Sequence, residues 1–410
     1  MANKFQPRFR TDLPQPAKRW NGFPRYNFVG GHNDASEVPV NELIAAAGSV
    51  LAREGRTLAY YGLESGAQGY LPLRQLVAAQ LTGRAKMRIG EDDILLTSGS
   101  LQALDLVFEA FLEPGDTVII EEACYGGTLS RLQRLGVTYI GIEVDQDGMK
   151  TDRLAEVLGE LAAKGQTPKL IYTIPTVQNP TGTVMSEARR IELLALAEKY
   201  DLPIFEDDCY ADLLWEGERP PSIRGLEQEG ADSGRVIYCG SFSKTVAPAL
   251  RVGYLVAGWP VLSRLLPLKT DAGSGALEQM VLAEYGAARF DDHVADLSAV
   301  LKEKAELMAA SLAEQFGAQV EFTAPKGGIF IWVTFPEEVD TTSLAAAALE
   351  EGVEINPGVE WSVDPSYGRR RVRLCFGSAT KQEISEGIAR LADICHKHTG
   401  IPARSGNMER

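Results

Sequence analysis

The chain has 410 residues, of which 45% are hydrophobic and 24% charged, and this is enough for two domains of ordinary size with sizeable cores. Its net charge of −15 disfavours nucleic-acid binding, and no apolar run approaches the ~20 residues of a membrane span, which disfavours membrane insertion. The five cysteines are scattered without a C-x-x-C pair and the N-terminus lacks the apolar core of a secretory signal, so we expect a cytoplasmic protein without a disulfide framework or structural zinc site.

Residues 1–45 are predicted to form an irregular N-terminal arm together with part of a smaller domain. Four prolines interrupt helix formation in this arm: Pro7, Pro14, Pro16 and Pro24. A helix is expected from Val40 to about Glu54. The segment from Tyr60 to Arg74 contains several glycines and a proline, which indicates a loop that enters a helix.

From Asp92 to about Val256, short apolar runs alternate with amphipathic helical patterns. This alternation predicts an α/β fold with a mainly parallel sheet flanked by helices, inside a large domain that covers residues 46–290. The expected strands are Ile94–Leu96, Thr117–Ile120, Val137–Ile142, Leu170–Ile174, Pro203–Glu206, Val236–Tyr238 and Tyr254–Ala257.

After Asp292 the pattern changes to a long helical region that runs to about Phe316, followed by mixed strands and helices. This change predicts a smaller α+β domain that covers residues 291–410. Its expected elements are strands at Gly328–Thr334 and Val372–Cys375 and helices at Thr342–Glu351 and Lys381–His396.

Lys244 stands out because it ends the segment Gly240-Ser241-Phe242-Ser243-Lys244, directly after a predicted strand, with Arg251 shortly after it. Most lysines lie on solvated faces, so the neighbours carry the argument. A lysine near another cation in a partly dry pocket has a lowered pKa, and its free amine can attack a carbonyl to form a Schiff base. The guanidinium of Arg251 and the hydroxyl of Ser241 can hold a phosphate.

Three further segments lie at the ends of predicted strands: Ser98–Gln102, Asn179–Gly182 and Phe205–Tyr210. The first has a glycine that lets the backbone approach a phosphate at a helix N-terminus. The third places acids where α/β sheets build their sites. Each segment alone also has a structural interpretation, as a common turn or a helix N-cap. Their occurrence together and in this order is the stronger signal.

The ordered set resembles the class I/II aminotransferases of the fold-type I pyridoxal-phosphate group, from about Gly30 to the last predicted helix. The segments Gly69–Arg74 and Gly240–Lys244 most resemble 2-aminoadipate and multi-substrate aminotransferases, and also the catalytic domain of MocR-type regulators. The resemblance implies a seven-stranded type of sheet and an enzyme that moves the amino group of an L-amino acid to 2-oxoglutarate or pyruvate by ping-pong chemistry. It also implies a homodimer with active sites at the subunit interface, and no metal.

The resemblance implies a role for each matching residue. Lys244 would hold pyridoxal 5'-phosphate and move the substrate's α-proton, while Asp207 would keep the pyridine nitrogen protonated. Asn179 and Tyr210 would hydrogen-bond the phenolic oxygen of the ring, and Tyr125 would stack on its face. The residues that would bind the phosphate are Ser100, Leu101, Gln102, Ser241, Ser243 and Arg251, together with Tyr61 of the neighbouring subunit.

Arg373 matches the arginine that binds the substrate's α-carboxylate, with Gly31 and Asn179 nearby. Strand alternation puts Arg371 on the same face, so either arginine fits the sequence. Tyr60 is likewise an alternative to Tyr61.

The amino acid itself stays open, because Asn356 and Trp361 depart from the family's commonest residues and no second arginine clearly suits a side-chain carboxylate; Arg25 and His32 are conceivable. Other pyridoxal-phosphate reactions on the same scaffold are β-elimination, decarboxylation and racemisation. A binding or regulatory module is a third hypothesis. The complete catalytic set and the lack of room for an N-terminal DNA-binding domain argue against it.

Overall fold

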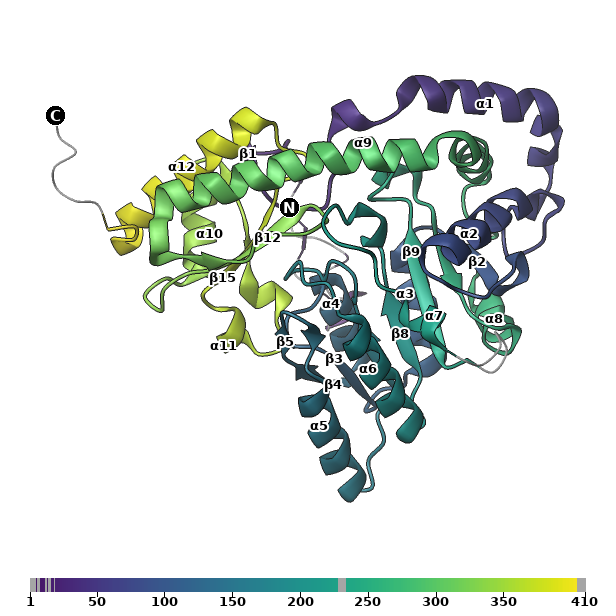
Figure 1. Ribbon diagram of the computed structural model, residues 1–410, viewed down its shortest axis with the longest axis horizontal. Helices are drawn as coiled ribbons and strands as arrows, with labels where there is room; N and C mark the ends of the chain where they lie inside the picture. The colour runs from purple at the N-terminus through teal and green to yellow at the C-terminus, as the bar shows by residue number, and fades with distance from the viewer. Residues whose placement is uncertain are drawn as a thin grey trace.

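The computed structural model describes residues 5, 8–11, 13, 16–17, 19–227 and 234–403, so that Pro7 and Pro14 of the predicted arm lie outside the described residues. Figure 1 shows two sheets with their helices, and the long helix α9 (Ala276–Phe316) running beside both. Within the described residues, no helix is both long enough and apolar enough to cross a membrane.

The larger sheet has seven strands in the order β2-β10-β9-β8-β7-β3-β4. All its pairings are parallel except those of β10, which runs antiparallel to β2 and β9. The prediction of a mainly parallel sheet is therefore confirmed. The strands are β2 (Ile94–Thr97), β3 (Thr117–Glu121), β4 (Thr138–Ile142), β7 (Leu170–Thr173), β8 (Ile204–Asp207), β9 (Val236–Ser241) and β10 (Gly253–Val256).

Helices cover both faces of this sheet because its strands are apolar on both sides. On β3, Val118 and Ile120 pack into one buried cluster and Ile119 into another, as alternation along a strand requires. The covering helices are α2 (Leu71–Arg84), α3 (Ser100–Phe111), α4 (Gly126–Leu135), α5 (Thr151–Ala163), α6 (Glu187–Lys199), α7 (Ile223–Leu226), α8 (Trp259–Leu265) and the first part of α9.

The smaller sheet is antiparallel and has the order β11-β12-β15-β14. Its strands are β11 (Glu321–Phe322), β12 (Phe330–Thr334), β14 (Asn356–Pro357) and β15 (Arg371–Cys375). The helices α10 (Thr341–Glu350), α11 (Pro365–Gly368) and α12 (Lys381–Thr399) lie in the same part of the molecule (Figure 1). The α+β pattern predicted for this region is confirmed.

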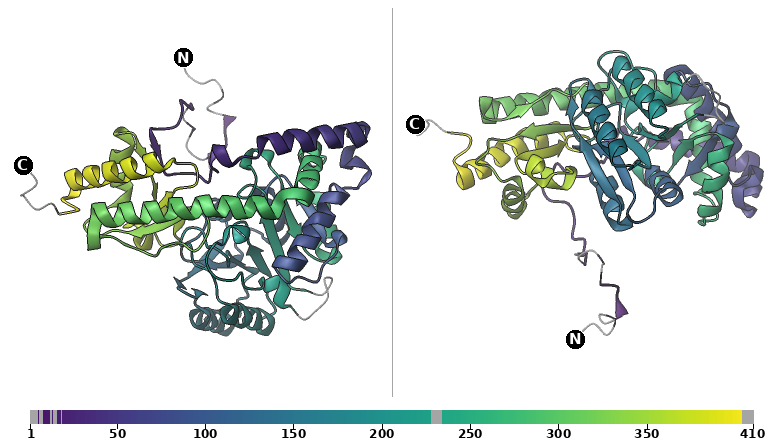
Figure 2. Two further views of the ribbon diagram at one scale, coloured as in Figure 1. Left: turned by 45° about the horizontal axis from the view of Figure 1, so that its top comes forward. Right: turned by 90° about the horizontal axis from the view of Figure 1, so that it is seen from below.

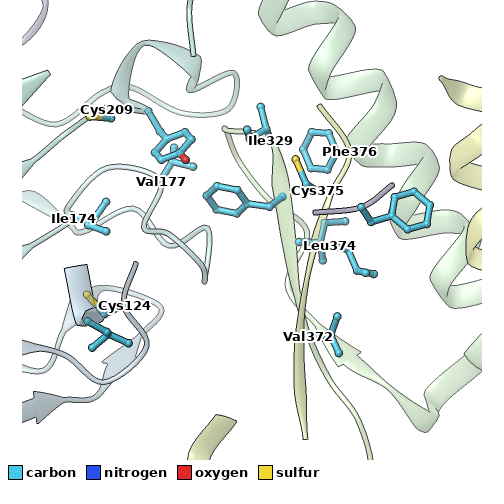
Figure 3. Close-up of a cluster of buried hydrophobic side chains, with 14 of the residues drawn as sticks. Cys124, Ile174, Val177, Cys209, Ile329, Val372, Leu374, Cys375 and Phe376 are labelled. Atoms are coloured by element: carbon cyan, nitrogen blue, oxygen red, sulfur yellow. The ribbon is translucent and has the colours of Figure 1, made fainter. Parts of the chain in front are cut away.

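Figure 3 shows that one buried cluster joins the two parts, with Cys124 and Ile174 on the side of the large sheet and Leu374 and Cys375 on the side of the small one. The helix α9 begins before the predicted start at Asp292. Gly286 lies inside it, where Leu76 of α2 packs so closely that a Cβ on residue 286 would come within 2.6 Å of that side chain. The predicted domain division stays a prediction, and α9 runs continuously through residue 290.

The N-terminal segment is fixed by β1 (Tyr26–Asn27), which pairs in parallel with β13 (Val353–Glu354). The helix α1 (Val40–Glu54) has the predicted bounds and lies on the outside of the molecule beside α9 (Figures 1 and 2). A short hairpin of β5 (Val144–Asp145) and β6 (Gly148–Met149) follows the large sheet's edge strand. The chain between β1 and α1 passes close to the end of β9, because Gly31 O accepts a hydrogen bond from Lys244 just after that strand.

Candidate active site

A cavity of about 340 Å³ lies at the carboxyl ends of the parallel strands, where β8 ends at Asp207 and β9 ends at Ser241. It brings together most of the residues that the sequence singled out. The predicted residues that line it are Gly31, Ser100, Leu101, Tyr125, Asn179, Asp207, Tyr210, Ser241, Ser243, Lys244, Arg251 and Arg373. Six further lining residues are Gly30, Ile174, Cys209, Pro248, Asn356 and Trp361.

Lys244 lies just after β9 and its Nζ donates a hydrogen bond to the carbonyl oxygen of Gly31 at 2.7 Å. Among the described residues, no carboxylate lies within ion-pair distance of this amine. Burial lowers the pKa of Lys244, and the positive charges of Arg373 and Arg251 lower it as well. A Cβ on Gly31 would lie 2.5 Å from Nζ, so a side chain here would displace the amine from this position. The amine is thus available as a nucleophile and base.

Asp207, the last residue of β8, is 6% exposed and accepts a hydrogen bond from the hydroxyl of Tyr172 at 2.7 Å. Burial raises the pKa of this carboxyl, and hydrogen bonds from Cys209 and Tyr172 oppose the rise. A buried carboxylate of this kind can pair with a protonated ring nitrogen.

Asn179 connects two other cavity groups. Its Nδ2 lies 3.5 Å from the hydroxyl of Tyr210, and its Oδ1 accepts from Arg373 Nη1 at 3.2 Å. Burial raises the pKa of Tyr210 well above its usual range, so this side chain stays a neutral phenol that can donate a hydrogen bond. These groups can therefore bind and orient a polar oxygen inside the cavity.

An anion cradle forms where α3 begins at Ser100, because the first N–H groups of a helix have no partner within the helix. Arg251 lies beside it, with Nη2 donating to Ser98 O at 3.1 Å and Nη1 lying 3.5 Å from Ser243 Oγ. Gly99 has a φ of 79°, and a side chain there would collide with the guanidinium of Arg251. The cradle has the charge and N–H donors that suit a phosphate.

Arg373 on β15 is 3% exposed and enters the cavity held on several sides. Its Nη2 donates to Gly30 O at 2.7 Å and to Asn356 Oδ1 at 2.8 Å. Its guanidinium carbon lies 3.7 Å from the ring centroid of Trp361. In the described chain no carboxylate forms an ion pair with it, and its buried Nε has no hydrogen-bond partner.

Arg371, the alternative to Arg373, is placed elsewhere. Its guanidinium lies 3.7 Å from the ring centroid of Tyr367 and it does not line the cavity. The geometry thus favours Arg373 as the cationic group that meets a carboxylate in this cavity.

Two predicted phosphate ligands do not line this cavity. The amide of Gln102 is bonded to Asp271 Oδ2 at 2.7 Å and to the N–H of Ser98 at 2.8 Å, so that a phosphate contact through its backbone stays a prediction. Tyr61 is 89% exposed and lies, with Tyr60, at a separate cavity of about 750 Å³. Within one chain it does not meet the anion cradle.

Sequence reasoning missed two buried groups below the cavity, Tyr172 and Gln178. The available signal was a polar side chain in an apolar strand or in the loop after it, since such a group must find a partner when it is buried. Their partners are distant in sequence, so the structure was needed to identify them.

A family model described as aminotransferase class I and II matches residues 31–391. The chain is 34% identical to aromatic-amino-acid aminotransferase 1 of Thermococcus litoralis, over 90% of this chain and 87% of that one. It is similar to the solved structure of the multiple substrate aminotransferase from Thermococcus profundus, with a TM-score of 0.86, 32% identity and 92% of each chain covered.

A second similar structure is LysN, the α-aminoadipate aminotransferase from Thermus thermophilus, complexed with N-(5'-phosphopyridoxyl)-L-leucine. The TM-score is 0.82 and the identity 32%, over 91% of this chain and 92% of that one. The chain therefore belongs to the class I and II aminotransferases, and the predicted fold type and enzyme class are confirmed.

Proposed function

We propose that this aminotransferase uses pyridoxal 5'-phosphate, held covalently by Lys244, to move the amino group of an L-amino acid to a 2-oxo acid by ping-pong chemistry. The observation that carries the proposal is one cavity that holds the amine of Lys244, the buried carboxylate of Asp207 and the guanidinium of Arg373. These groups match an aldehyde, a ring nitrogen and a substrate carboxylate.

The residues present fit this cofactor. The N-terminus of α3 at Ser100 and Leu101, with Arg251 beside it, suits the phosphate, and the hydroxyls of Ser241 and Ser243 line the same cavity. The ring of Tyr125 lies in the cavity wall, where it can stack on an aromatic ring. That the related LysN is complexed with a phosphopyridoxyl amino acid supports the assignment.

When bound, the cofactor supplies an electron sink for the pair of electrons left when the substrate's α C–H bond breaks. Lys244 would remove that proton and return it at the neighbouring carbon, and its lowered pKa favours the neutral amine that this step requires. Asp207 would hold a proton on the ring nitrogen, and Asn179 and Tyr210 would hydrogen-bond the phenolic oxygen.

Arg373 would bind the α-carboxylate of both substrates through its planar fork, in the cavity that Gly31 and Asn179 also line. An amino acid and a 2-oxo acid share this carboxylate, so one arginine serves both halves of a ping-pong cycle. The acceptor that we propose is 2-oxoglutarate or pyruvate.

We also propose a homodimer in which Tyr61 of one subunit reaches the phosphate of the other, with Tyr60 as the alternative. The exposed side chains of Val40, Ile44 and Leu51 lie along α1, and a second copy would bury such apolar groups. A cytoplasmic location would keep the five unpaired thiols reduced. The proposed domains are residues 46–290 and 291–410, with residues 1–45 as the arm and part of the smaller one.

The test is a half-reaction. The protein loaded with pyridoxal phosphate is mixed with single amino acids in the absence of any oxo acid, and the cofactor's absorbance is recorded. Transamination leaves the amino group on the cofactor, so at least one amino acid must convert it to the pyridoxamine form, and 2-oxoglutarate or pyruvate must reverse the change. Release of ammonia, carbon dioxide or the enantiomer with the cofactor unchanged would contradict the proposal and indicate a lyase, decarboxylase or racemase.

A further inference from the structure

A buried amide ties together two loops at the cavity edge of the large sheet. The Nε2 of Gln178 donates to the carboxylate of Glu121 at 2.9 Å and to the carbonyl oxygen of Ala123 at 2.7 Å. Glu121 and Ala123 belong to the end of β3 and the turn after it, whereas Gln178 lies in the loop after β7. Glu121 is 1% exposed and Gln178 is 2% exposed, so this contact is shielded from water.

The remaining atoms of both side chains are also engaged. The Oε1 of Gln178 accepts from the N–H of Thr181 at 2.9 Å and from its hydroxyl at 2.8 Å. Glu121 accepts from the Thr173 hydroxyl at 2.6 Å and from the Ile174 N–H at 3.2 Å. A fully satisfied buried network of this kind fixes the orientation of every member.

The two loops that are tied together supply cavity groups. Asn179 follows Gln178 directly and contacts both Arg373 and Tyr210. Tyr125 lies two residues after Ala123 and lines the same cavity as Asn179. Neither Gln178 nor Glu121 lines the cavity, so any effect on the reaction must act through these neighbours.

We propose that Gln178 and Glu121 are a positioning pair that fixes Asn179 relative to Tyr125 and thereby sets how Arg373 is presented to the substrate's α-carboxylate. The inference rests on the proposed function. A purely structural contact at this place could be apolar, because an apolar pair of similar volume is often as stable as a buried charge with its partner. Directional hydrogen bonds add a fixed geometry, which carboxylate recognition requires.

The central experiment replaces Gln178 with Met, which keeps the length of the side chain and removes its hydrogen bonds. The matched control is Thr176→Val, which removes a buried hydroxyl of the same loop that accepts from Arg190 at 3.0 Å, away from Glu121. Both variants should melt at a lower temperature than the parent. Only Gln178→Met should raise KM for the amino donor and the oxo acid, by about tenfold each, with kcat changed less than about threefold.

A second measurement does not depend on turnover. The absorbance of the bound cofactor is titrated with pH, and its midpoint should rise by about half a unit or more in Gln178→Met, because a weakened hydrogen bond from Asn179 disfavours the deprotonated phenolic oxygen. The midpoint of Thr176→Val should equal that of the parent.

Glu121→Gln provides an independent variant. If the NH2 group of the new side chain faces the Nε2 of Gln178, two donors meet, and if it faces Thr173 instead, the hydrogen bond that Thr173 donates is lost. If the two residues act as one unit, the double variant Glu121→Gln/Gln178→Met should raise KM no more than the larger single effect. Purely additive effects on KM would overturn the proposed pair.

The proposal is also overturned if folded Gln178→Met keeps both KM values within about threefold of the parent and the pH midpoint of the cofactor's absorbance unchanged. If Gln178→Met does not fold, the same criterion applies to Glu121→Gln. A parent protein that binds no pyridoxal phosphate would instead overturn the proposed function, so the two failures are distinguishable.

Discussion

The hydroxyl of Tyr172 donates a hydrogen bond to Oδ2 of Asp207 at 2.7 Å between two neighbouring parallel strands. Both residues are buried in the large sheet. Ionising a buried carboxylate is unfavourable, so burial raises the pKa of Asp207, and the bond from Tyr172 opposes that rise. Tyr172 therefore favours the charged form that a protonated ring nitrogen needs as its partner.

Replacing Tyr172 with Phe should lower kcat by about tenfold and leave KM nearly unchanged, because the pKa of Asp207 would rise further and the cofactor's nitrogen would hold its proton less firmly. The measurement is kcat and KM as a function of pH. Tyr238→Phe is the matched control, since its hydroxyl lies 3.3 Å from Asp208, which does not line the cavity. An equal loss of kcat in both variants would mean that only packing had been disturbed.

Replacing Lys244 with Ala should lower turnover by at least about a thousandfold, because the variant loses both the covalent anchor and the proton-moving group. Borohydride reduction followed by peptide mass analysis should find the phosphopyridoxyl group on Lys244 in the parent and on no lysine of the variant. A label on another lysine, or turnover near the parent rate, would contradict the assignment.

The conservative change Arg373→Lys should raise KM for both the amino donor and the oxo acid by about tenfold to a hundredfold, since an ammonium cannot bind a carboxylate through two parallel bonds. Arg371→Lys should change either KM by less than about threefold, because Arg371 packs on Tyr367 outside the cavity. Steady-state kinetics of the two variants side by side decide between these arginines. The reverse ranking would favour Arg371.

Much of the fold could be predicted because strands buried on both faces are continuous apolar runs. This is how the segments around Ile119, Ile171 and Ile204 were recognised. The antiparallel direction of β10 could not be predicted in this way, because strand direction depends on the short connection from Ser241 to Gly253 rather than on the strand's own residues. The early start of α9 was missed in a part of the helix that contains Gly286, and glycine is a poor helix former that weakens the helical pattern.

The cavity groups that follow strand ends were predictable in the same manner, since the carboxyl ends of parallel strands meet at one edge. Asp207, Ser241 and Lys244 come together for this reason. The choice between Arg371 and Arg373 could not be predicted, because alternation gives both residues the same face. Only the structure separates them, since Arg371 packs on Tyr367 whereas Arg373 enters the cavity. Partners such as Tyr172 are defined by contacts across strands, which no local pattern encodes.

Glu121 should make stability depend on pH. Burial raises the pKa of its carboxyl from 4.5 to about 7, although hydrogen bonds from Thr173 and Gln178 oppose the rise. A group whose pKa is higher in the folded state contributes its full stabilisation of the fold at a pH below its unfolded pKa. This contribution is lost as the pH rises through the folded pKa. The folded chain should therefore lose about 3 kcal/mol from this group between these two pKa values.

The measurement for Glu121 is the free energy of unfolding in urea at several pH values for the parent and for Glu121→Gln, which cannot titrate. The free energy of unfolding of the parent, relative to that of Glu121→Gln, should fall as the pH rises from about 4.5 to 8. Glu109→Gln on the exposed side of α3 is the control and should track the parent. A constant difference between the parent and Glu121→Gln would show that Glu121 does not titrate in this range.

Mixed dimers should test whether Tyr61 acts across the proposed subunit interface. Tyr61 is 89% exposed and does not line the cavity that contains Lys244 in the same chain. Because the proposed dimer places Tyr61 at the phosphate of the other subunit, Tyr61→Ala should weaken cofactor binding, whereas Tyr60→Ala should weaken it less. When the inactive Lys244→Ala and the impaired Tyr61→Ala proteins are unfolded, mixed and refolded together, half of the subunits should pair as hybrids. In each hybrid one site combines an intact Lys244 with an intact Tyr61 from the other chain, so activity should rise above that of either variant. The measurement is the turnover of hybrids purified through a separate tag on each chain. If each site instead drew both residues from one chain, no site of the hybrid would be more active than a site of Tyr61→Ala.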